Sequence, residues 1–163
     1  MPKYRLLNKE ELESLEQEFI EYLIVNGIMA DDWVKMKEEE PEKAEEIVDL
    51  FSDVVFEGVM RKIGFLERRT PKQLQLFQCL PNKLLMFGLN AQENSLADFT
   101  KPEYLLKAMQ NPPKDMQLYQ AEKPYSKVRE QEIFELTQQG CEISDGKLFK
   151  AVAMLYAEVK AKS

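Results

Sequence analysis

The chain has 163 residues, of which 44% are hydrophobic and 31% charged, a balance typical of a folded globular protein. Its formal net charge of −7 opposes binding to nucleic acid and to anionic membrane surfaces. It contains no histidine, which excludes Ser–His–Asp and Cys–His catalysis, histidine-ligated metals and the usual general base at neutral pH.

The first part of the chain predicts two helices. Asn8 followed three residues later by Glu11 is the pattern of a capping box, and apolar residues then recur at helical spacing. Gly27 is the expected end of this first helix, because glycine adopts the left-handed conformation that closes many helices. A second, short helix is expected around Trp33.

A long third helix is predicted over residues 41–63. Proline suits the first position of a helix, and Pro41 stands directly before a long apolar pattern. The apolar residues surround most of the helix circumference, which predicts a central helix that is buried on more than one side. Phe51 is expected at the centre of this packing.

The middle of the chain changes from helical spacing to the alternation of a β-strand. Phe65–Arg69 is the first predicted strand, and residues 73–78 and 84–89 are the next two. Pro81 and Asn82 form a turn signal, so the last two strands are expected to make a hairpin. Residues 116–119 alternate again and are expected to add a strand to this sheet.

Three more helices are predicted in the second half of the chain. Thr100 and Ser126 are expected to cap two of them, since a serine or threonine hydroxyl accepts a hydrogen bond from the first helical turn. Gly140 is the expected stop of the second of these helices. Ser144 or Asp145 is expected to open the last helix.

The order of these elements predicts the fold class. Helices open and close the chain and strands are grouped in the middle, which indicates an α+β fold rather than alternating α/β units. We therefore predict five to six helices around a small, mainly antiparallel sheet of three to four strands. The length fits one globular domain over residues 1–163.

The two cysteines predict a reducing environment. Cys79 and Cys141 lie 62 positions apart and form neither a CxxC motif nor a disulfide framework, so we expect two free, buried thiols. We find no apolar signal-peptide region and no apolar run of the roughly 18 residues that a membrane span needs. The prediction is a cytoplasmic protein that makes no membrane contact.

The charges are unevenly distributed along the chain. Residues 1–60 hold 17 acidic and 6 basic residues, a net charge of −11, whereas residues 61–163 hold 12 and 16, a net charge of +4. Opposite patches steer association more than they supply affinity. We expect these halves to attract each other within one chain or across a homodimer, with Trp33 and Met36 as the apolar anchor of the dimer.

Three carboxylates on the predicted long helix are the candidates for chemistry. Asp49, Asp53 and Glu57 are spaced at i, i+4 and i+8 and therefore share one helix face. Such a row can bind a divalent cation through oxygen ligands, or divide the roles of acid and base. The alternative is a solvated polar edge on a buried helix. Whether the row faces a pocket or bulk water distinguishes the two.

Two charged segments allow both a functional and a structural interpretation. The glutamates of residues 38–46 could dock a basic partner, or could stabilise the start of a helix through its dipole. The basic residues between Arg61 and Lys83, with Phe65 and Phe77 among them, are compatible with a platform for single-stranded nucleic acid. The competing interpretation, which we prefer, places both aromatic rings in the core.

Residues around the predicted Ser126 cap could hold an anion. Ser126, Lys127 and Arg129 would lie at a helix N-terminus, where backbone N–H groups favour negative charge. The simpler interpretation is an ordinary helix cap. No glycine-rich phosphate loop and no known catalytic motif occurs in the sequence.

Three stretches resemble a family of short uncharacterised bacterial proteins. They are residues 3–6 (Lys-Tyr-Arg-Leu), residues 49–59 (Asp-Leu-Phe-Ser-Asp-Val-Val-Phe-Glu-Gly-Val) and residues 125–129 (Tyr-Ser-Lys-Val-Arg). The resemblance spans most of the chain. It implies a bacterial, cytoplasmic origin and assigns no activity.

These observations predict a non-catalytic protein-binding or interaction module whose partner is another protein or a second copy of the chain. The alternative is a carboxylate-dependent enzyme, with or without a divalent metal, that uses Asp49, Asp53 and Glu57. We assign no residue a catalytic, cofactor-binding or metal-binding role and predict no cofactor. Nucleic-acid binding is disfavoured.

Overall fold

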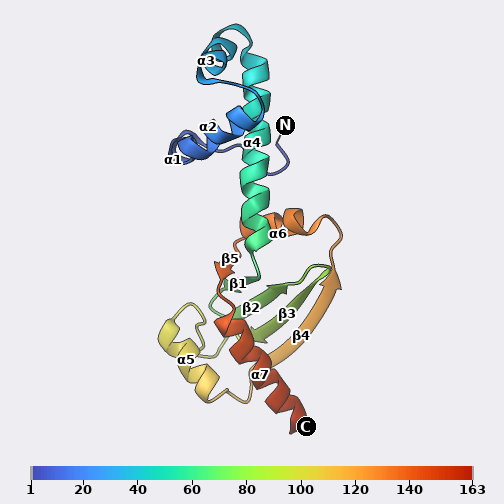
Figure 1. Ribbon diagram of the computed structural model, residues 1–163. Helices are drawn as coiled ribbons and strands as arrows, with labels where there is room; N and C mark the ends of the chain where they lie inside the picture. The colour runs from blue at the N-terminus through green and yellow to red at the C-terminus, as the bar shows by residue number, and fades with distance from the viewer. Residues whose placement is uncertain (1, 163) are drawn as a thin grey trace. The chain divides into compact units, whose positions relative to one another are not determined.

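The computed structural model describes residues 2–162 and divides into two compact units, one up to Arg61 and one from Lys62 onward (Figure 1). The N-terminal unit is helical, and the C-terminal unit contains the sheet. The expectation of one domain over the whole chain stays a prediction. In chain order the elements are α1 (Lys9–Ser14), α2 (Glu16–Val25), α3 (Ala30–Glu39), α4 (Pro41–Lys62), β1 (Phe65–Arg69), β2 (Gln73–Cys79), β3 (Lys83–Asn90), α5 (Pro102–Gln110), β4 (Gln117–Pro124), α6 (Arg129–Gln138), β5 (Glu142–Ser144) and α7 (Lys147–Ala161).

The predicted first helix is two helices. Asn8 and Glu11 form the expected capping box, with the Glu11 N–H donating to the Asn8 side chain at 2.8 Å. The helix then breaks at Leu15, where ψ is 21°. The Ser14 hydroxyl donates to the Glu11 carbonyl at 2.8 Å. Such local bonds from serine compete with the helical ladder and favour an end at this point.

Gly27 closes α2 as predicted. Its φ of 77° is the left-handed conformation that glycine adopts without a steric cost. The Ile28 N–H donates to the Leu23 carbonyl at 2.8 Å and the Gly27 N–H to the Ile24 carbonyl at 3.0 Å, which together make a Schellman motif.

The long helix α4 has nearly the predicted bounds, but its predicted burial on several sides is wrong. Ala44, Phe51, Ser52 and Met60 are its buried residues, whereas Leu50 is 57% exposed. The helix therefore buries one face. The apolar pattern indicates which side chains favour burial, but the three short helices of this unit are too small to cover the whole circumference.

Aromatic rings form the packing around Phe51 in the N-terminal unit. The Phe51 side chain is 2% exposed, and its ring centroid lies 4.9 Å from that of Phe19 and 5.4 Å from that of Tyr22. Trp33 is half-buried and meets Phe19 edge-on at 5.2 Å. Offset and edge-on rings at these distances add favourable contacts beyond simple burial.

The C-terminal unit contains one antiparallel sheet with the strand order β4-β3-β2-β1-β5. The β2–β3 hairpin turns at Pro81 and Asn82 as predicted, with Cys79 opposite Leu84. β4 includes the predicted residues 117–119 and extends to Pro124. β5 was missed, because three residues are too few to show alternation.

Helices α5 and α7 pack against one face of this sheet. Leu74 and Leu76 of β2 and Phe87 and Leu89 of β3 point toward these helices, where Val152 is completely buried. Because side chains alternate along a strand, the residues between these four point to the opposite face. The sheet thus has a core face and a second face.

Glycine at position 88 leaves room for an aromatic ring on the second face. A Cβ atom at Gly88 would stand 2.1 Å from the ring of Tyr119 on the neighbouring strand β4. An aromatic side chain over a strand glycine covers backbone that is otherwise exposed. Any larger residue at position 88 would displace this ring.

The predicted caps of α5 and α6 are wrong. α5 begins after Lys101, and Thr100 donates its hydroxyl to Asp98 instead of capping the helix. α6 begins after Val128, two residues later than a Ser126 cap would require. At the last helix the N-cap is Gly146, although the Asp145 carboxylate does accept from the Lys147 N–H at 3.0 Å.

The predicted fold class is confirmed. The described residues contain seven helices and a five-stranded antiparallel sheet, which is an α+β arrangement. The excess over five to six helices comes from the break at Leu15. The excess over three to four strands comes from the short β5.

Candidate functional site

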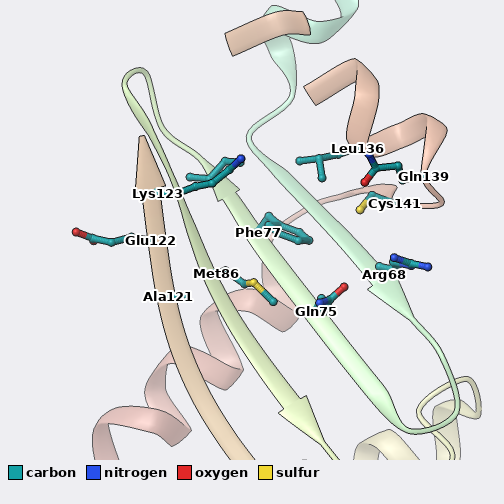
Figure 2. A pocket seen from close by; sticks show the side chains of 11 residues that line it. Arg68, Gln75, Phe77, Met86, Ala121, Glu122, Lys123, Leu136, Gln139 and Cys141 are labelled. Carbon is teal, nitrogen blue, oxygen red and sulfur yellow. The ribbon is translucent and has the colours of Figure 1, made fainter. Parts of the chain in front are cut away.

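The second face of the sheet carries a groove of about 390 Å³ (Figure 2). Its apolar floor crosses three strands: Phe77 of β2 pairs with Met86 of β3, which pairs with Ala121 of β4. We call this cavity the open-face groove. Large side chains fill the floor at β2 and β3, and the small Ala121 leaves it open toward the edge strand β4.

Helix α6 forms the wall of the open-face groove. Leu136 of its last turn and Gln139, the residue directly after the helix, line the cavity, and Ile133 one turn before Leu136 is completely buried. The helix ends in a Schellman motif at Gly140, whose φ is 109°. This turn directs the chain into β5 and brings Cys141 to the groove beside Leu136 and Gln139 (Figure 2).

Two neighbouring arginines of β1 have different surroundings. Arg69 lies 2.8 Å from the Glu67 carboxylate, on the strand face opposite to the groove. Arg68 is exposed at the β1 rim of the open-face groove and makes no hydrogen bond or ion pair with any described residue. The groove therefore has a guanidinium whose charge is not matched by a carboxylate among residues 2–162.

The cation on the other rim is already matched. Lys123 of β4 lies 3.1 Å from the carboxylate of Glu132, which is only 6% exposed. Glu132 also accepts from the Ser126 N–H at 2.9 Å and from its hydroxyl at 3.1 Å. Burial raises the pKa of Glu132, but the hydrogen bonds from Lys123 and Ser126 together lower it by more than that, so the pKa of Glu132 lies below the ordinary carboxyl value.

The anion that the residues around Ser126 could hold is replaced by the chain's own carboxylate. Glu132 takes the hydrogen bonds from Ser126 that an external anion would need. Arg129 donates to the backbone carbonyls of Ile63 at 2.5 Å, Cys79 at 3.0 Å and Leu80 at 3.3 Å. These groups hold the end of β2 against the start of α6.

Both thiols are buried and weakly acidic. Burial raises the pKa of Cys79 to about 11, and burial also raises the pKa of Cys141, although the nearby Arg68 lowers it in part. The thiolate is the reactive form of cysteine, so both side chains are poor nucleophiles at neutral pH. The prediction of two free, buried cysteines is confirmed for the described residues.

The three candidate carboxylates of α4 are partly exposed, and those of Asp53 and Glu57 have structural partners. Asp53 accepts from the backbone N–H groups of Lys3 at 2.7 Å and Tyr4 at 3.4 Å. Glu57 lies 3.4 Å from Arg61, one turn further along the helix. Asp49 and Asp53 border a shallow cavity of about 290 Å³ together with Leu50. The described residues contain no cluster of carboxylates or cysteines suited to a metal ion.

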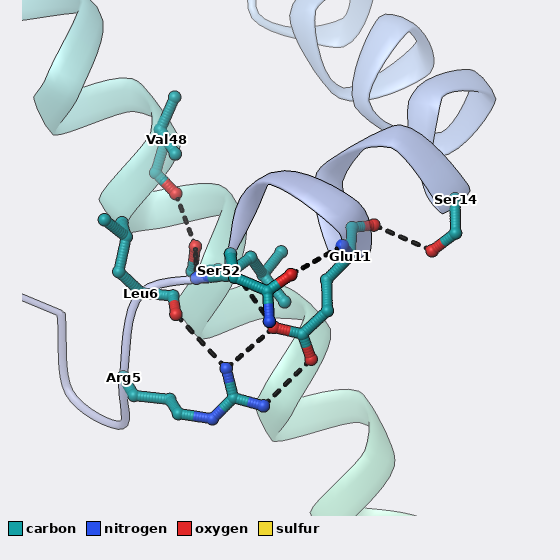
Figure 3. A network of polar contacts seen from close by, with 8 residues as sticks. Arg5, Leu6, Glu11, Ser14, Val48 and Ser52 are labelled. Carbon is teal, nitrogen blue, oxygen red and sulfur yellow. Dashed lines mark hydrogen bonds and ion pairs between the residues drawn. The ribbon is translucent and has the colours of Figure 1, made fainter.

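The carboxylate of Asp53 belongs to a larger set of contacts that holds residues 3–7 against α4. Figure 3 shows the part of this set around Ser52 and Arg5. Ser52, which is completely buried, accepts from the Leu7 N–H at 3.2 Å and donates to the Val48 carbonyl at 2.9 Å. Arg5 forms two 2.8 Å hydrogen bonds with Glu11. We call these contacts the N-terminal clasp.

The two charged segments have mostly structural surroundings. The glutamates of residues 38–46 are exposed around the start of α4, where they border an open cavity. In the basic segment Lys83 pairs with Glu122, and Lys72 donates to the carbonyls of Ser95 and Ala97. Phe65 packs on Phe149 in the core as preferred, whereas Phe77 forms the groove floor.

The sequence-based interpretation missed Phe77 and the groove. The signal was present, because the apolar pair Leu76-Phe77 interrupts the alternation of β2 and must place apolar side chains on both faces. Arg68 and Cys141 could not be found this way, since only the packing of α6 brings them to one cavity.

The comparisons with known proteins define a family and no activity. The family model described as a family of unknown function, DUF6495, matches residues 1–157, and the chain belongs to this family. No curated protein matches the chain, and no solved structure matches it. Among residues 2–162, none of the helices has the length and apolar character required to cross a bilayer.

Proposed function

We propose that this protein is a non-catalytic binding module and that its ligand occupies the open-face groove. The observation that supports this proposal is a concave, mostly apolar surface of about 390 Å³ on the sheet face opposite α5 and α7. Clefts of about 300–1,000 Å³ with apolar linings and a few polar groups are the usual form of ligand sites.

The titratable groups around the groove support binding rather than catalysis. Proton transfer needs an acid and a base within hydrogen-bonding distance of one substrate. The Cys141 thiol has a raised pKa, and the Lys123 ammonium is bound by Glu132. The Glu122 side chain points away from the cavity and pairs with Lys83 (Figure 2).

The carboxylate-dependent alternative has less support. An acid–base pair needs carboxylates that are available to a substrate, and Asp53 already accepts two backbone N–H groups while Glu57 pairs with Arg61. No specific observation favours the enzyme over the binding module. A protein partner, a second copy of the chain and a cytoplasmic location remain part of the proposal.

The binding of a neutral apolar dye tests the proposed function. N-phenyl-1-naphthylamine carries no charge at neutral pH and fluoresces more strongly in an apolar environment. We expect one dye molecule to bind to each chain, because the described groove accommodates one aromatic body. The measurement is a fluorescence titration on the folded, full-length protein.

Two tryptophan substitutions on the same strand locate the dye. Ala121→Trp places an indole beside Met86 over the groove floor and should weaken dye binding at least roughly ten-fold. Gln120→Trp is the matched control, because Gln120 is also exposed on β4 but points to the other face. Absence of binding to the wild type, or equal binding by all three proteins, would contradict the proposal.

A further inference from the structure

The open-face groove has an apolar end and a charged end. Its floor near β4 consists of Met86 and Ala121, and the charged side chains described at this end are paired, Lys123 with Glu132 and Glu122 with Lys83. Arg68 stands at the β1 end and has no carboxylate partner among residues 2–162. The cavity therefore changes from apolar at its β4 end to positively charged at its β1 end.

The chemistry of Arg68 selects the group that would bind at this end. A guanidinium presents a planar set of N–H donors and can form a bidentate pair of hydrogen bonds with a carboxylate or a similar anion. Next to an apolar floor, this attraction is stronger than in bulk water. The Gln75 amide, opposite Arg68 in the β1–β2 ladder, is a further hydrogen-bonding group at the same end.

The size of the cavity limits the apolar part of the ligand. From β4 to β1 is three strand spacings, or about 14 Å at the usual separation of neighbouring strands. A molecule that fills the floor at Met86 and reaches Arg68 therefore needs an apolar body one or two rings long, or a short alkyl chain, with one anionic group at its end.

We infer that the open-face groove binds a small amphipathic acid, with its apolar body over Phe77 and Met86 and its anionic group at Arg68. This inference rests on the proposed function. A concave cavity of this volume suits a small molecule better than a flat protein interface, which buries about 800 Å² on each partner. The unmatched positive charge of Arg68 complements the acid.

A pair of dyes that differ in charge tests the inference. 1-Anilinonaphthalene-8-sulfonate is the anionic relative of N-phenyl-1-naphthylamine and has the same ring system. We expect the wild type to bind the anionic dye more tightly than the neutral one by roughly five-fold or more. Rising salt should reduce this preference, because the Arg68 side chain is exposed.

Matched arginine variants assign the preference to one side chain. Arg68→Gln should weaken binding of the anionic dye far more than binding of the neutral dye, so that the preference for the anionic dye disappears. Arg69→Gln is the control, because it removes the same charge from the next residue of β1, which points to the other face and pairs with Glu67. Arg68→Lys should restore part of the preference, since it keeps the charge.

Displacement of the neutral dye tests whether the groove prefers a carboxylic acid with an alkyl chain to the matching alcohol. We expect decanoate to displace the dye at a lower concentration than decan-1-ol, and Arg68→Gln to remove this difference. Equal affinity for the two dyes in the wild type, or equal effects of Arg68→Gln and Arg69→Gln, would overturn the inference. If the neutral dye binds normally in that case, the proposed function stands and only the charge assignment fails. If neither dye binds, both fail.

Discussion

Replacing Phe51 by alanine removes the most deeply buried ring of the N-terminal unit. Its side chain is 2% exposed and packs between the rings of Phe19 and Tyr22. Emptying such a site costs about 3–5 kcal/mol, from lost burial and from the cavity left behind. With a urea slope of about 2 kcal/mol per M, a loss of about 4 kcal/mol lowers the unfolding midpoint by about 2 M.

The natural reporter for this experiment is Trp33, the single tryptophan of the chain, which touches Phe19 in the same unit. Leu50→Ala is the matched control, because Leu50 is the preceding residue of α4 and is 57% exposed. Exposed substitutions usually change stability by no more than about 0.5 kcal/mol. A loss under about 1 kcal/mol for Phe51→Ala, or an equal loss for both variants, would refute the assigned packing.

Three further outcomes are expected. Hydrogen bonds from Arg5 and from the Asn8 N–H lower the pKa of Glu11 to about 2 from an ordinary value of 4.5. The stabilising effect of the Glu11 carboxylate is therefore complete above about pH 4.5 and is lost as the pH falls through about 2. An NMR titration of Glu11 with a midpoint near 4.5 would contradict this expectation. The thiols of Cys79 and Cys141 should react slowly with a thiol reagent in the native protein at neutral pH, because both are buried and have raised pKa values. Rapid stoichiometric labelling would contradict this expectation by showing that one thiol is accessible. The opposite charges of the two halves predict a homodimer in which the acidic half of one chain lies near residues 61–83 of the other. Light scattering that finds the mass of a single chain at about 100 μM in low salt would contradict this prediction. If a dimer is seen, Trp33→Ala should dissociate it.

The strands could be predicted from the sequence because their signals are local. Alternation marks β2, and the Pro81-Asn82 turn fixes the hairpin with β3, so that the observed pairing follows from short-range chemistry. The Gly27 and Gly140 stops were predictable for the same reason, since their left-handed conformations suit glycine. The Asn8 cap belongs to this group as well.

Features that depend on what packs nearby could not be predicted. The apolar pattern of α4 is genuine, but Leu50 stays exposed because the other helices of its unit cover only one face. Ser126 has the chemistry of a helix cap, yet Glu132 takes its hydrogen bonds and the helix starts three residues later. In each case a tertiary neighbour decided between options that local sequence left open.

The candidate site shows the same division. The spacing of Asp49, Asp53 and Glu57 correctly places three carboxylates on one helix, but spacing carries no information about the backbone of Lys3, to which Asp53 is bonded. Arg68 looked like one member of a basic segment. Arg68 differs from Arg69 because successive side chains of β1 point to opposite faces of the sheet. Glu67 lies on the same face as Arg69 and pairs with it, whereas Arg68 points to the groove.

The N-terminal clasp has a consequence for how the chain folds during synthesis. Lys3 and Tyr4 leave the ribosome before the carboxylate that binds them, because that carboxylate belongs to Asp53, made 50 positions after Lys3. At about 5–20 residues per second, this interval lasts roughly 3–10 s. Until Ser52 and Asp53 are made, the backbone of residues 3–7 lacks these partners on α4, so this segment is among the last parts of its unit to become ordered.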